Sequence, residues 1–394
     1  MVNKYLYAKG GAELYMLRLG SFLITQGHEV QYFGMDGEHR VVGNDANSYV
    51  SNIDFHNCSL LKKALYSIKS IYNIEARYRI RPVIDSFNPD VIHLNNFNFQ
   101  LTPSIMVEIL KWKKRTQSKC RIVYTAHDGQ LICPNHQLRN PISKRVCTKC
   151  INGDFFYCVK NKCIHRSTMR SLVGTMEAYY WNWRGIYTHI DTIICCSSFF
   201  KSLFDNNMEF RKRTILIQNF SDEYIEVGVN KKDYVIYFGR YSEEKGLLTL
   251  IEVCKSLKNI RFIFAGSGPL ECNLEGINNI TNVGYKSGGE LKKLIREARF
   301  SICPSECYEN CPFSVIESIK LGTPVIGANI GGIPELIEQG KTGELFESGN
   351  RDKLEEKIRI MWGNRNRNDY LKGCLEAYFN SIESYVHELV KYYI

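Results

Sequence analysis

The sequence predicts an α/β protein of two βα domains in series, from its length, its apolar pattern and one polar segment. Its 394 residues exceed what a single hydrophobic core usually organises. Short apolar runs alternate with stretches of helical periodicity, which is typical of parallel sheets with crossover helices. The segment 219–233 (NFSDEYIEVGVNKKD) is polar and lacks such periodicity, so we expect it to be the linker.

The short apolar runs are the expected strands. Those of the first half are Glu29–Phe33, Val91–Leu94, Ile122–Thr125 and Thr192–Cys195. Those of the second half are Tyr234–Phe238, Arg261–Ala265, Ile280–Val283, Phe300–Cys303 and Pro324–Gly327. A final amphipathic helix is expected at 376–394, with one face made of Phe379, Ile382, Val386 and Val390. We therefore expect domains at 1–215 and 216–375, followed by that helix.

The positive charge is concentrated in the first half. Residues 1–215 carry 29 Lys+Arg against 16 Asp+Glu, whereas the remainder carries 22 against 25. Such asymmetry suits nucleic acid, a phosphate-bearing lipid or a membrane face, and it also suits a solvated basic surface. Leu60–Arg81 reads as one basic amphipathic helix that could rest on anionic lipid, with a second basic cluster at Lys111–Lys119. We favour the membrane surface.

The sequence also bears on where the protein resides. No stretch approaches the roughly 18 apolar residues of a membrane helix, and the start MVNKYLYAKGG lacks a secretory h-region. Only MVNKYLY precedes the first glycine loop, so the first strand is expected to be short or clipped. The 15 cysteines are an odd number, which favours reduced thiols. We expect a cytoplasmic protein, peripheral at the inner face of the cell membrane.

Two strand ends of the second domain carry residues suited to a diphosphate. In FGRYSEEKG, Gly239 allows a sharp turn, and Arg240 and Lys245 supply two cations at the edge where open α/β sheets bind ligands. The next strand ends in AGSGP, where Gly266 and Gly268 allow a ligand to approach the backbone. Each motif alone is weak, because an ordinary βα turn has the same residues.

A longer motif favours a ligand-binding site over an ordinary βα turn. PSECYENCPFSVIESIKLGTPVIGANIGGIPELI places Glu309 in a loop and Glu317 in the following helix. The Glu317 carboxylate could accept both hydroxyls of a ribose, and Glu309 would face the group attached to the phosphate. Backbone N–H groups at the helix start favour phosphate. These belong to the loop residues Asn310, Phe313, Ser314 and Val315.

These motifs resemble those of the family-4 retaining glycosyltransferases, and bacterial capsule and surface-polysaccharide enzymes in particular. The resemblance covers essentially the whole chain and is most specific over Pro304–Gly332. It implies the GT-B architecture, in which two Rossmann-like domains face each other across a cleft and the final helix returns to the N-terminal domain. Many members read Glu-Gly-Phe-Gly where this chain has Glu309-Asn310-Cys311-Pro312, so the donor sugar stays open.

The resemblance also implies roles for single residues. Arg240 and Lys245 would bind the donor diphosphate, Glu317 would hold the ribose, and Glu309 would meet the sugar hydroxyls. The acceptor would attack on the face that the diphosphate leaves, and the diphosphate would help to take the proton. The main physical requirement is then to stabilise the departing phosphate charge. No carboxylate cluster is apparent, so we expect catalysis without a divalent ion.

The first domain has two motifs at its expected cleft. In AKGGAE, Gly10 and Gly11 form an open helix start that can receive phosphate or a sugar. In YTAHDGQLICPN, His127 follows a strand; alone it would more often be structural, but it matches the family's cleft histidine, which implies a role in orienting the transferred sugar. Asp128 could fix the tautomer of His127 or act on the loop.

A cysteine-rich insert is expected at 133–165. Cys147-x2-Cys150 and Cys158-x4-Cys163 could offer four thiolates to one structural zinc ion. The alternative is a loop of buried or free thiols.

Taken together, the sequence predicts a glycosyltransferase that moves a sugar from a UDP- or GDP-sugar to a glycan acceptor, expected to be lipid-linked, in surface-polysaccharide biosynthesis. One alternative is a nucleotide-sugar epimerase of the same fold, although no carboxylate set for acid and base chemistry is evident in the first domain. The other is a non-enzymatic basic scaffold for nucleic acid or membrane. No nucleic-acid motif surrounds the basic residues, so we expect no nucleic-acid partner.

Overall fold

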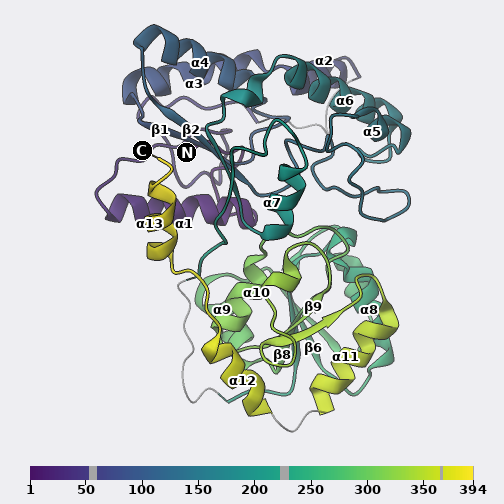
Figure 1. The fold of residues 1–394 in the computed structure, drawn as a ribbon. Helices are drawn as coiled ribbons and strands as arrows, with labels where there is room; N and C mark the ends of the chain where they lie inside the picture. The colour runs from purple at the N-terminus through teal and green to yellow at the C-terminus, as the bar shows by residue number, and fades with distance from the viewer. Residues whose placement is uncertain (53–59, 222–229, 364–366, 394) are drawn as a thin grey trace. The chain divides into compact units, whose positions relative to one another are not determined.

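The computed structural model describes residues 1–52, 60–221, 230–363 and 367–393 (Figure 1). The chain divides into two compact units. Unit 1 comprises Met1–Gln218 with Ile382–Ile394, and unit 2 comprises Asn219–Ser381. Residues 222–229, which form most of the expected linker, lie outside the described part of the chain.

Unit 1 contains a four-stranded parallel sheet in the order β1-β2-β3-β4. The strands are β1 (Val91–Leu94), β2 (Arg121–Ala126), β3 (Thr192–Cys195) and β4 (Thr214–Leu216). The expected strand at Glu29–Phe33 is wrong, because Phe33 forms only an isolated bridge to Val2, which in turn bridges Leu94. Tyr32 and Phe33 are nevertheless buried. Strand β4 was missed, since three residues are too short to show a pattern.

The helices of unit 1 are α1 (Gly11–Thr25), α2 (Leu60–Ile71), α3 (Ile74–Phe87), α4 (Ser104–Thr116), α5 (Phe156–Lys160), α6 (Thr168–Trp183), α7 (Ser198–Asp205) and α13 (Ile382–Val390). The expected single helix Leu60–Arg81 is wrong, because it is two helices. Asn73 stands at the break and caps α3 by accepting a hydrogen bond from the N–H of Ala76 at 3.1 Å.

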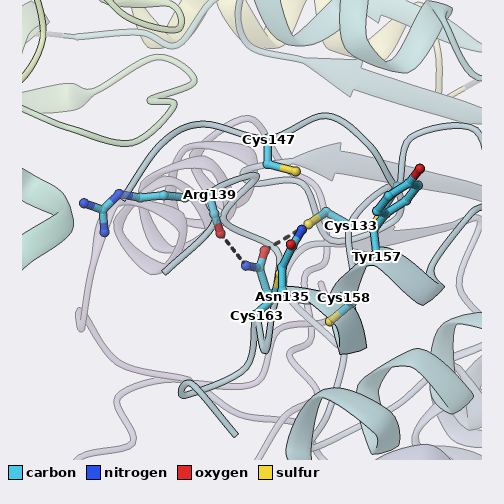
Figure 2. A pocket seen from close by; sticks show the side chains of 9 residues that line it. Cys133, Asn135, Arg139, Cys147, Tyr157, Cys158 and Cys163 are labelled. Atoms are coloured by element: carbon cyan, nitrogen blue, oxygen red, sulfur yellow. Dashed lines mark hydrogen bonds between the residues drawn. The ribbon is translucent and has the colours of Figure 1, made fainter. Parts of the chain in front are cut away.

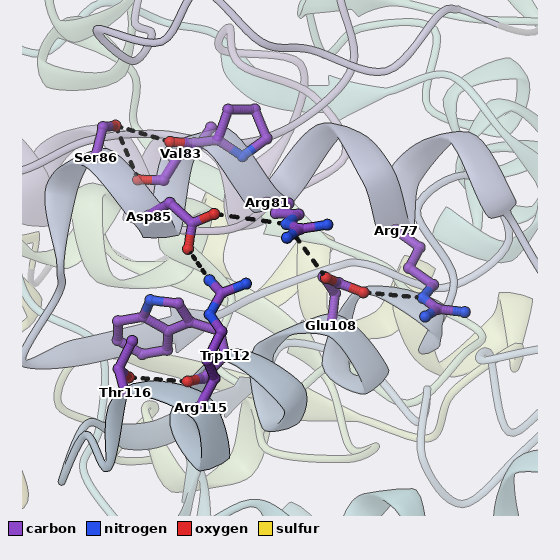
Figure 3. A network of polar contacts seen from close by, with 10 residues as sticks. Arg77, Arg81, Val83, Asp85, Ser86, Glu108, Trp112, Arg115 and Thr116 are labelled. Carbon is purple, nitrogen blue, oxygen red and sulfur yellow. Dashed lines mark hydrogen bonds and ion pairs between the residues drawn. The ribbon is translucent and has the colours of Figure 1, made fainter.

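Two of the three arginines of α3, Arg77 and Arg81, are paired with carboxylates, as Figure 3 shows. Arg77 contacts Glu108 of α4 at 3.0 Å, and Arg81 lies 3.6 Å from Asp85 and 3.9 Å from Glu108. Arg115 of the second basic cluster also bonds Asp85. This part of the predicted lipid-facing surface therefore joins α3 to α4. Among the described residues, no helix is long and apolar enough to cross a membrane.

The last helix was expected to begin at Glu376, and this is wrong. Helix α12 (Arg367–Glu376) ends there, and α13 begins at Ile382 with Tyr385, Val386 and Leu389 as its buried residues. The hydroxyl of Tyr385 lies 2.6 Å from that of Tyr15 in α1. The expected return of the final helix to the N-terminal domain is confirmed.

Unit 2 contains a six-stranded parallel sheet in the order β10-β9-β8-β5-β6-β7. The strands are β5 (Val235–Arg240), β6 (Phe262–Ser267), β7 (Ile280–Gly284), β8 (Phe300–Cys303), β9 (Val325–Ala328) and β10 (Gly343–Phe346). The helices are α8 (Leu247–Ser256), α9 (Gly288–Glu297), α10 (Phe313–Lys320), α11 (Arg351–Gly363) and α12. The five expected strands are confirmed. Between β8 and β5 the strand order reverses, and open α/β sheets bind ligands at such a switch point.

A buried carboxyl in α6 makes the stability of unit 1 depend on pH. Glu177 is 3% exposed, and burial raises the pKa of its carboxyl from 4.5 to about 8. The stability that it contributes is fully present below its unfolded pKa and is lost as pH rises through about 8. We expect Glu177→Gln to leave the free energy of unfolding nearly unchanged at pH 5 and to raise it by about 2 to 4 kcal/mol at pH 9.

Urea titrations at the two pH values measure this difference. The matched control is Glu383→Gln on α13, whose side chain is exposed. An equal gain at pH 5 and pH 9 would contradict the assignment.

Candidate functional site

In unit 2, a lysine and a glutamate meet at the switch point. Lys245 ends a short turn after β5, and Glu309 lies in the loop between β8 and α10. The Lys245 Nζ lies 2.5 Å from Glu309 Oε1, and the Ser305 hydroxyl donates to the same oxygen at 2.6 Å. Because β5 and β8 are neighbours, residues far apart in sequence reach one edge of the sheet.

Both members of this pair stay charged near neutral pH. Burial alone would raise the pKa of Glu309, but the Lys245 ammonium and the hydrogen bonds from Lys245 and Ser305 bring it below its usual value. Burial alone would lower the pKa of Lys245, but the Glu309 carboxylate raises it. The Lys245 side chain is 35% exposed although its ammonium contacts Glu309.

Arg240 lies at the end of β5, with an exposed side chain. Its carbonyl accepts a hydrogen bond from the Tyr237 hydroxyl at 2.8 Å, which holds the backbone at this point. Within the described residues, no hydrogen bond or ion pair joins Arg240 to Lys245 or Glu309. The structure therefore brings Lys245 and Glu309 together and leaves the guanidinium of Arg240 in solvent.

The glycines at the ends of β5 and β6 serve the packing of the chain itself. A Cβ atom on Gly266 would lie 1.9 Å from the carbonyl oxygen of Gly239, and one on Gly268 would lie 2.4 Å from that of Tyr241. No side chain fits at either position. Packing within the chain itself therefore requires glycine at positions 266 and 268, independently of the expected approach of a ligand.

The start of α10 has no side-chain cap, because Pro312 precedes it. Phe313 and Val315 are buried, and the N–H of Val315 donates to the Pro312 carbonyl at 3.1 Å. Asn310 is buried, whereas Ser314 and Glu317 are half-buried. The amide of Val315 is thus used within the helix, which weakens its expected role in binding phosphate.

Two residues that the sequence did not single out support this loop. Asn219 donates its side-chain N–H to the Cys311 carbonyl at 2.8 Å, and the rings of Phe220 and Phe313 meet edge to face at 6.0 Å. Both lie in the segment expected to be a linker, where a polar pattern concealed their contacts.

In unit 1, His127 follows β2 and contacts Asn95, which follows β1. Its Nε2 lies 2.8 Å from Asn95 Oδ1, and the Asn95 amide donates to the Val2 carbonyl at 3.4 Å. This arrangement places the imidazole proton on Nε2 and leaves Nδ1 as an acceptor. Burial lowers the pKa of His127 to about 3, so the ring is neutral at physiological pH.

A buried network lies behind this histidine. The Tyr15 ring meets the His127 ring edge to face, with centroids 4.8 Å apart. The Tyr15 hydroxyl lies 3.1 Å from Thr125 Oγ1 and 2.6 Å from the Tyr385 hydroxyl. Tyr15 is therefore held from both sides, and its ring restricts the position of His127.

The network continues through His93. Its Nε2 lies 2.7 Å from Thr125 Oγ1, and its Nδ1 lies 2.6 Å from the Tyr393 hydroxyl. Burial lowers the pKa of His93, which favours the neutral ring. None of these partners forms a sequence motif, because they come from α1, β1, β2 and the end of the chain.

The glycine loop of unit 1 begins α1 without a side-chain cap, with Gly10 at the N-cap position and Gly11 as the first helical residue. The first turn holds Glu13, which is buried and accepts a hydrogen bond from the Asn3 side chain at 3.1 Å. Asp128 lies in the loop after β2, and burial raises the pKa of its carboxyl to about 6. The carboxyl groups of Glu13 and Asp128 near this helix start disfavour the binding of a phosphate there.

The zinc prediction for the cysteine-rich insert is not supported. Among the residues described, no three His, Cys, Asp or Glu side chains are arranged so that they could hold a metal ion. Figure 2 shows the pocket, with Cys133 donating to Asn135 at 2.9 Å. Burial raises the pKa of Cys133 to about 12, which favours the thiol. The pocket is also lined by Cys147, Cys150, Cys158 and Cys163.

Comparisons with known proteins identify the family and the fold. The chain matches the description "Glycosyltransferase Family 4" over residues 9–223 and "Glycosyl transferases group 1" over residues 222–372. An uncharacterized glycosyltransferase of Methanocaldococcus jannaschii is 28% identical over 201 residues, which are 50% of this chain and 56% of that protein. The putative colanic acid biosynthesis glycosyltransferase WcaL of Salmonella typhimurium is 30% identical over 140 residues, 32% and 34% of the two chains. These matches span about half or less of the relatives' lengths.

Solved structures show the fold. Sucrose-phosphate synthase from Thermosynechococcus elongatus is 17% identical, with a TM-score of 0.67 over 100% of this chain and 97% of that one. Anabaena HepE in complex with UDP-glucose is 15% identical, with a TM-score of 0.64 over 99% and 97%. The expected GT-B fold is thereby confirmed. With more than half of its residues matched to one family description, the chain belongs to Glycosyltransferase Family 4.

Proposed function

We propose that the protein is a retaining glycosyltransferase that moves a sugar from a UDP- or GDP-sugar to a lipid-linked glycan acceptor in surface-polysaccharide biosynthesis. The observation that carries this proposal is the ion pair of Lys245 and Glu309 at the switch point of the unit 2 sheet. Family membership, the UDP-glucose bound by the structural neighbour HepE and the colanic acid function in the name of WcaL support it.

Unit 2 would bind the donor. Lys245 would stabilise the leaving diphosphate from the switch point, and exposed Arg240 would close on it in bidentate fashion. Glu309, oriented by Lys245 and Ser305, would accept hydrogen bonds from the sugar hydroxyls. Glu317, in the second turn of α10, would bind the ribose.

Unit 1 would bind the acceptor and orient the sugar. His127 is neutral, so its free Nδ1 would accept a hydrogen bond from a sugar hydroxyl without adding charge. Glu13 at the start of α1 suits a hydroxyl better than a phosphate at the Gly10-Gly11 loop. The leaving diphosphate would take the acceptor proton, and we propose no metal ion for this step.

A thermal-shift panel tests the proposal. At 100 times its dissociation constant, a ligand that binds only the folded protein stabilises it by about 2.7 kcal/mol. We expect UDP, GDP or one of their sugars to raise the melting temperature of the wild type, and Lys245→Met to lose that rise. A flat response to every uridine and guanosine compound would contradict the proposal.

We also propose that the protein works at an anionic membrane surface, where a lipid-linked acceptor resides. Arg77 and Arg81 of α3 contact carboxylates of α3 and α4. Lys62 and Lys63, also predicted to meet lipid, lie in a stretch whose side chains are outside the described part. The basic charge of unit 1 therefore supports membrane contact without locating it.

A further inference from the structure

Helix α6 presents an apolar stripe to solvent. Its members are between 39% and 83% exposed and recur at intervals of three and four residues, so they lie on one face of the helix. They are Met169, Leu172, Met176, Tyr179 and Trp183. The opposite face holds the buried residues Gly174, Ala178 and Trp181. An exposed helix face ordinarily carries charged residues, and a continuous apolar one marks a surface that meets a partner.

Neighbouring helices hold α6 in place and expose apolar side chains of their own. Helix α6 packs against α2 and α5, and the three helices lie together in Figure 1. The Trp181 indole donates to the Ile71 carbonyl of α2 at 2.9 Å, and the rings of Phe155 and Tyr179 lie 5.2 Å apart. Ile68 of α2 and Phe156 of α5 are also exposed. The stripe thus belongs to a helix that is held by contacts with α2 and α5.

The charges around the stripe are mostly positive. Residues 155–190 contain five Lys and Arg against one acidic residue, Glu177, which is buried, and exposed Asp154 and Asp191 flank this segment. Arg170 and Arg184 are exposed, and within the described residues neither is paired with a carboxylate. The Arg184 guanidinium instead lies 3.3 Å from the Tyr180 hydroxyl. An apolar stripe with cations beside it complements a surface that is apolar inside and anionic outside.

We propose that this face of α6 docks on an anionic phospholipid bilayer, with the helix lying in the plane of the headgroups. Met, Leu, Tyr and Trp would enter the boundary between headgroups and acyl chains, and the arginines would contact phosphate. A second copy of the chain fits less well, because a symmetric pair would bring the arginines of both copies together without carboxylates. The inference rests on the proposed membrane contact and is independent of sugar transfer.

Tryptophan quenching by brominated lipid locates the contact. Of the four tryptophans, Trp183 is 83% exposed, Trp112 and Trp181 are 2% and 0% exposed, and Trp362 of unit 2 is half-buried. Vesicles of brominated phosphatidylcholine and phosphatidylglycerol should quench the fluorescence of the wild type, and most of the quenching should disappear in Trp183→Phe. Co-sedimentation should show that Trp183→Phe still binds, because phenylalanine retains most of the apolar contact.

Variants of the stripe test its energetic role. Leu172→Gln with Met176→Gln should weaken binding to phosphatidylglycerol vesicles by about 10- to 100-fold. Arg170→Glu with Arg184→Glu should weaken it by at least about 10-fold, and the wild type should bind pure phosphatidylcholine correspondingly less. The matched control is Tyr378→Ser, an exposed aromatic of unit 2 that should bind as the wild type does.

Each opposite result overturns the inference. The first is that the wild type does not bind anionic vesicles. The second is that the double variant at Leu172 and Met176 and the double variant at Arg170 and Arg184 both bind as tightly as the wild type. The third is that the wild type is a dimer in sedimentation equilibrium and that Leu172→Gln with Met176→Gln dissociates it. Melting temperatures establish that the variants fold, and the nucleotide thermal-shift panel is run on the same proteins. A failed vesicle experiment with an intact nucleotide response would remove the docking surface and leave the proposed function standing.

Discussion

Replacing Lys245 with Met is expected to lower kcat/KM for sugar transfer by about 100- to 1000-fold, the scale of removing one preorganised charge from a transition state. The loss has two parts, because the ammonium would stabilise the departing diphosphate and also holds Glu309 in place. Steady-state transfer assays measure it. The melting temperature should fall as well, since Glu309 would keep a charge without its cation.

The control is Lys232→Met, which removes another lysine of unit 2. Lys232 contacts Glu297 at 2.7 Å, but its side chain is 59% exposed, so the change should alter kcat/KM by less than about threefold. Glu309→Gln and the double variant with Lys245→Met complete a cycle. We expect the double variant to be only slightly worse than Lys245→Met. Losses that multiply would show that the two residues act separately.

Replacing His127 with Ala is expected to lower kcat about 100-fold with a small change in KM, because a hydrogen bond that orients the sugar acts mainly in the transition state. The control is His189→Ala, at an exposed position of unit 1, which should behave as the wild type. Tyr15→Phe should give an intermediate loss, since it keeps the ring against His127 and removes the hydroxyl bonded to Thr125 and Tyr385. A normal kcat for His127→Ala would contradict the role of His127 in orienting the sugar.

The pH profile separates His127 from its neighbour. With a pKa of about 3, His127 contributes no titration between pH 5 and 9. Asp128, with a pKa of about 6, is ionised above that value and protonated below it. Any fall in kcat near pH 6 should therefore vanish in Asp128→Asn and persist in Tyr15→Phe.

Periodicity and chain length predicted most of the fold. Strands β5, β6, β8 and β9 were predictable because each is largely a buried apolar run between turns. Strand β7 is an edge strand with exposed Thr281 and Asn282, and β10, at the other edge, was missed because Gly343 and Glu344 interrupt its apolar pattern. The run at Glu29–Phe33 was misleading in extent, because only Phe33 pairs with Val2 although Tyr32 and Phe33 are both buried. The break between α2 and α3 depends on the Asn73 cap, which bonds to Thr102 far along the chain, so no local pattern reveals it.

Some residues of the candidate site could likewise be predicted from the sequence, and others could not. Lys245, Glu309 and His127 follow strands, and a motif read at a strand end places a residue at the edge of a parallel sheet. Tyr15, His93 and Tyr393 come from three distant segments, and only the tertiary structure shows that they bond to one another or to Thr125. The cysteine spacing suggested a metal because it gives the order of the thiols and says nothing of where each sulfur points.

The hydrogen bonds of Tyr385 and Tyr393 have a consequence for how the chain is made. Unit 1 combines residues 1–218 with residues 382–394, so its core stays open on the ribosome until residues 382–394 have been made. Unit 2 is continuous and can fold beforehand. A polypeptide that stops before Tyr393 would retain every donor motif and lose the partner of His93. Synthesis of residues 382–394 therefore completes the support behind His127 after the donor unit has already been made.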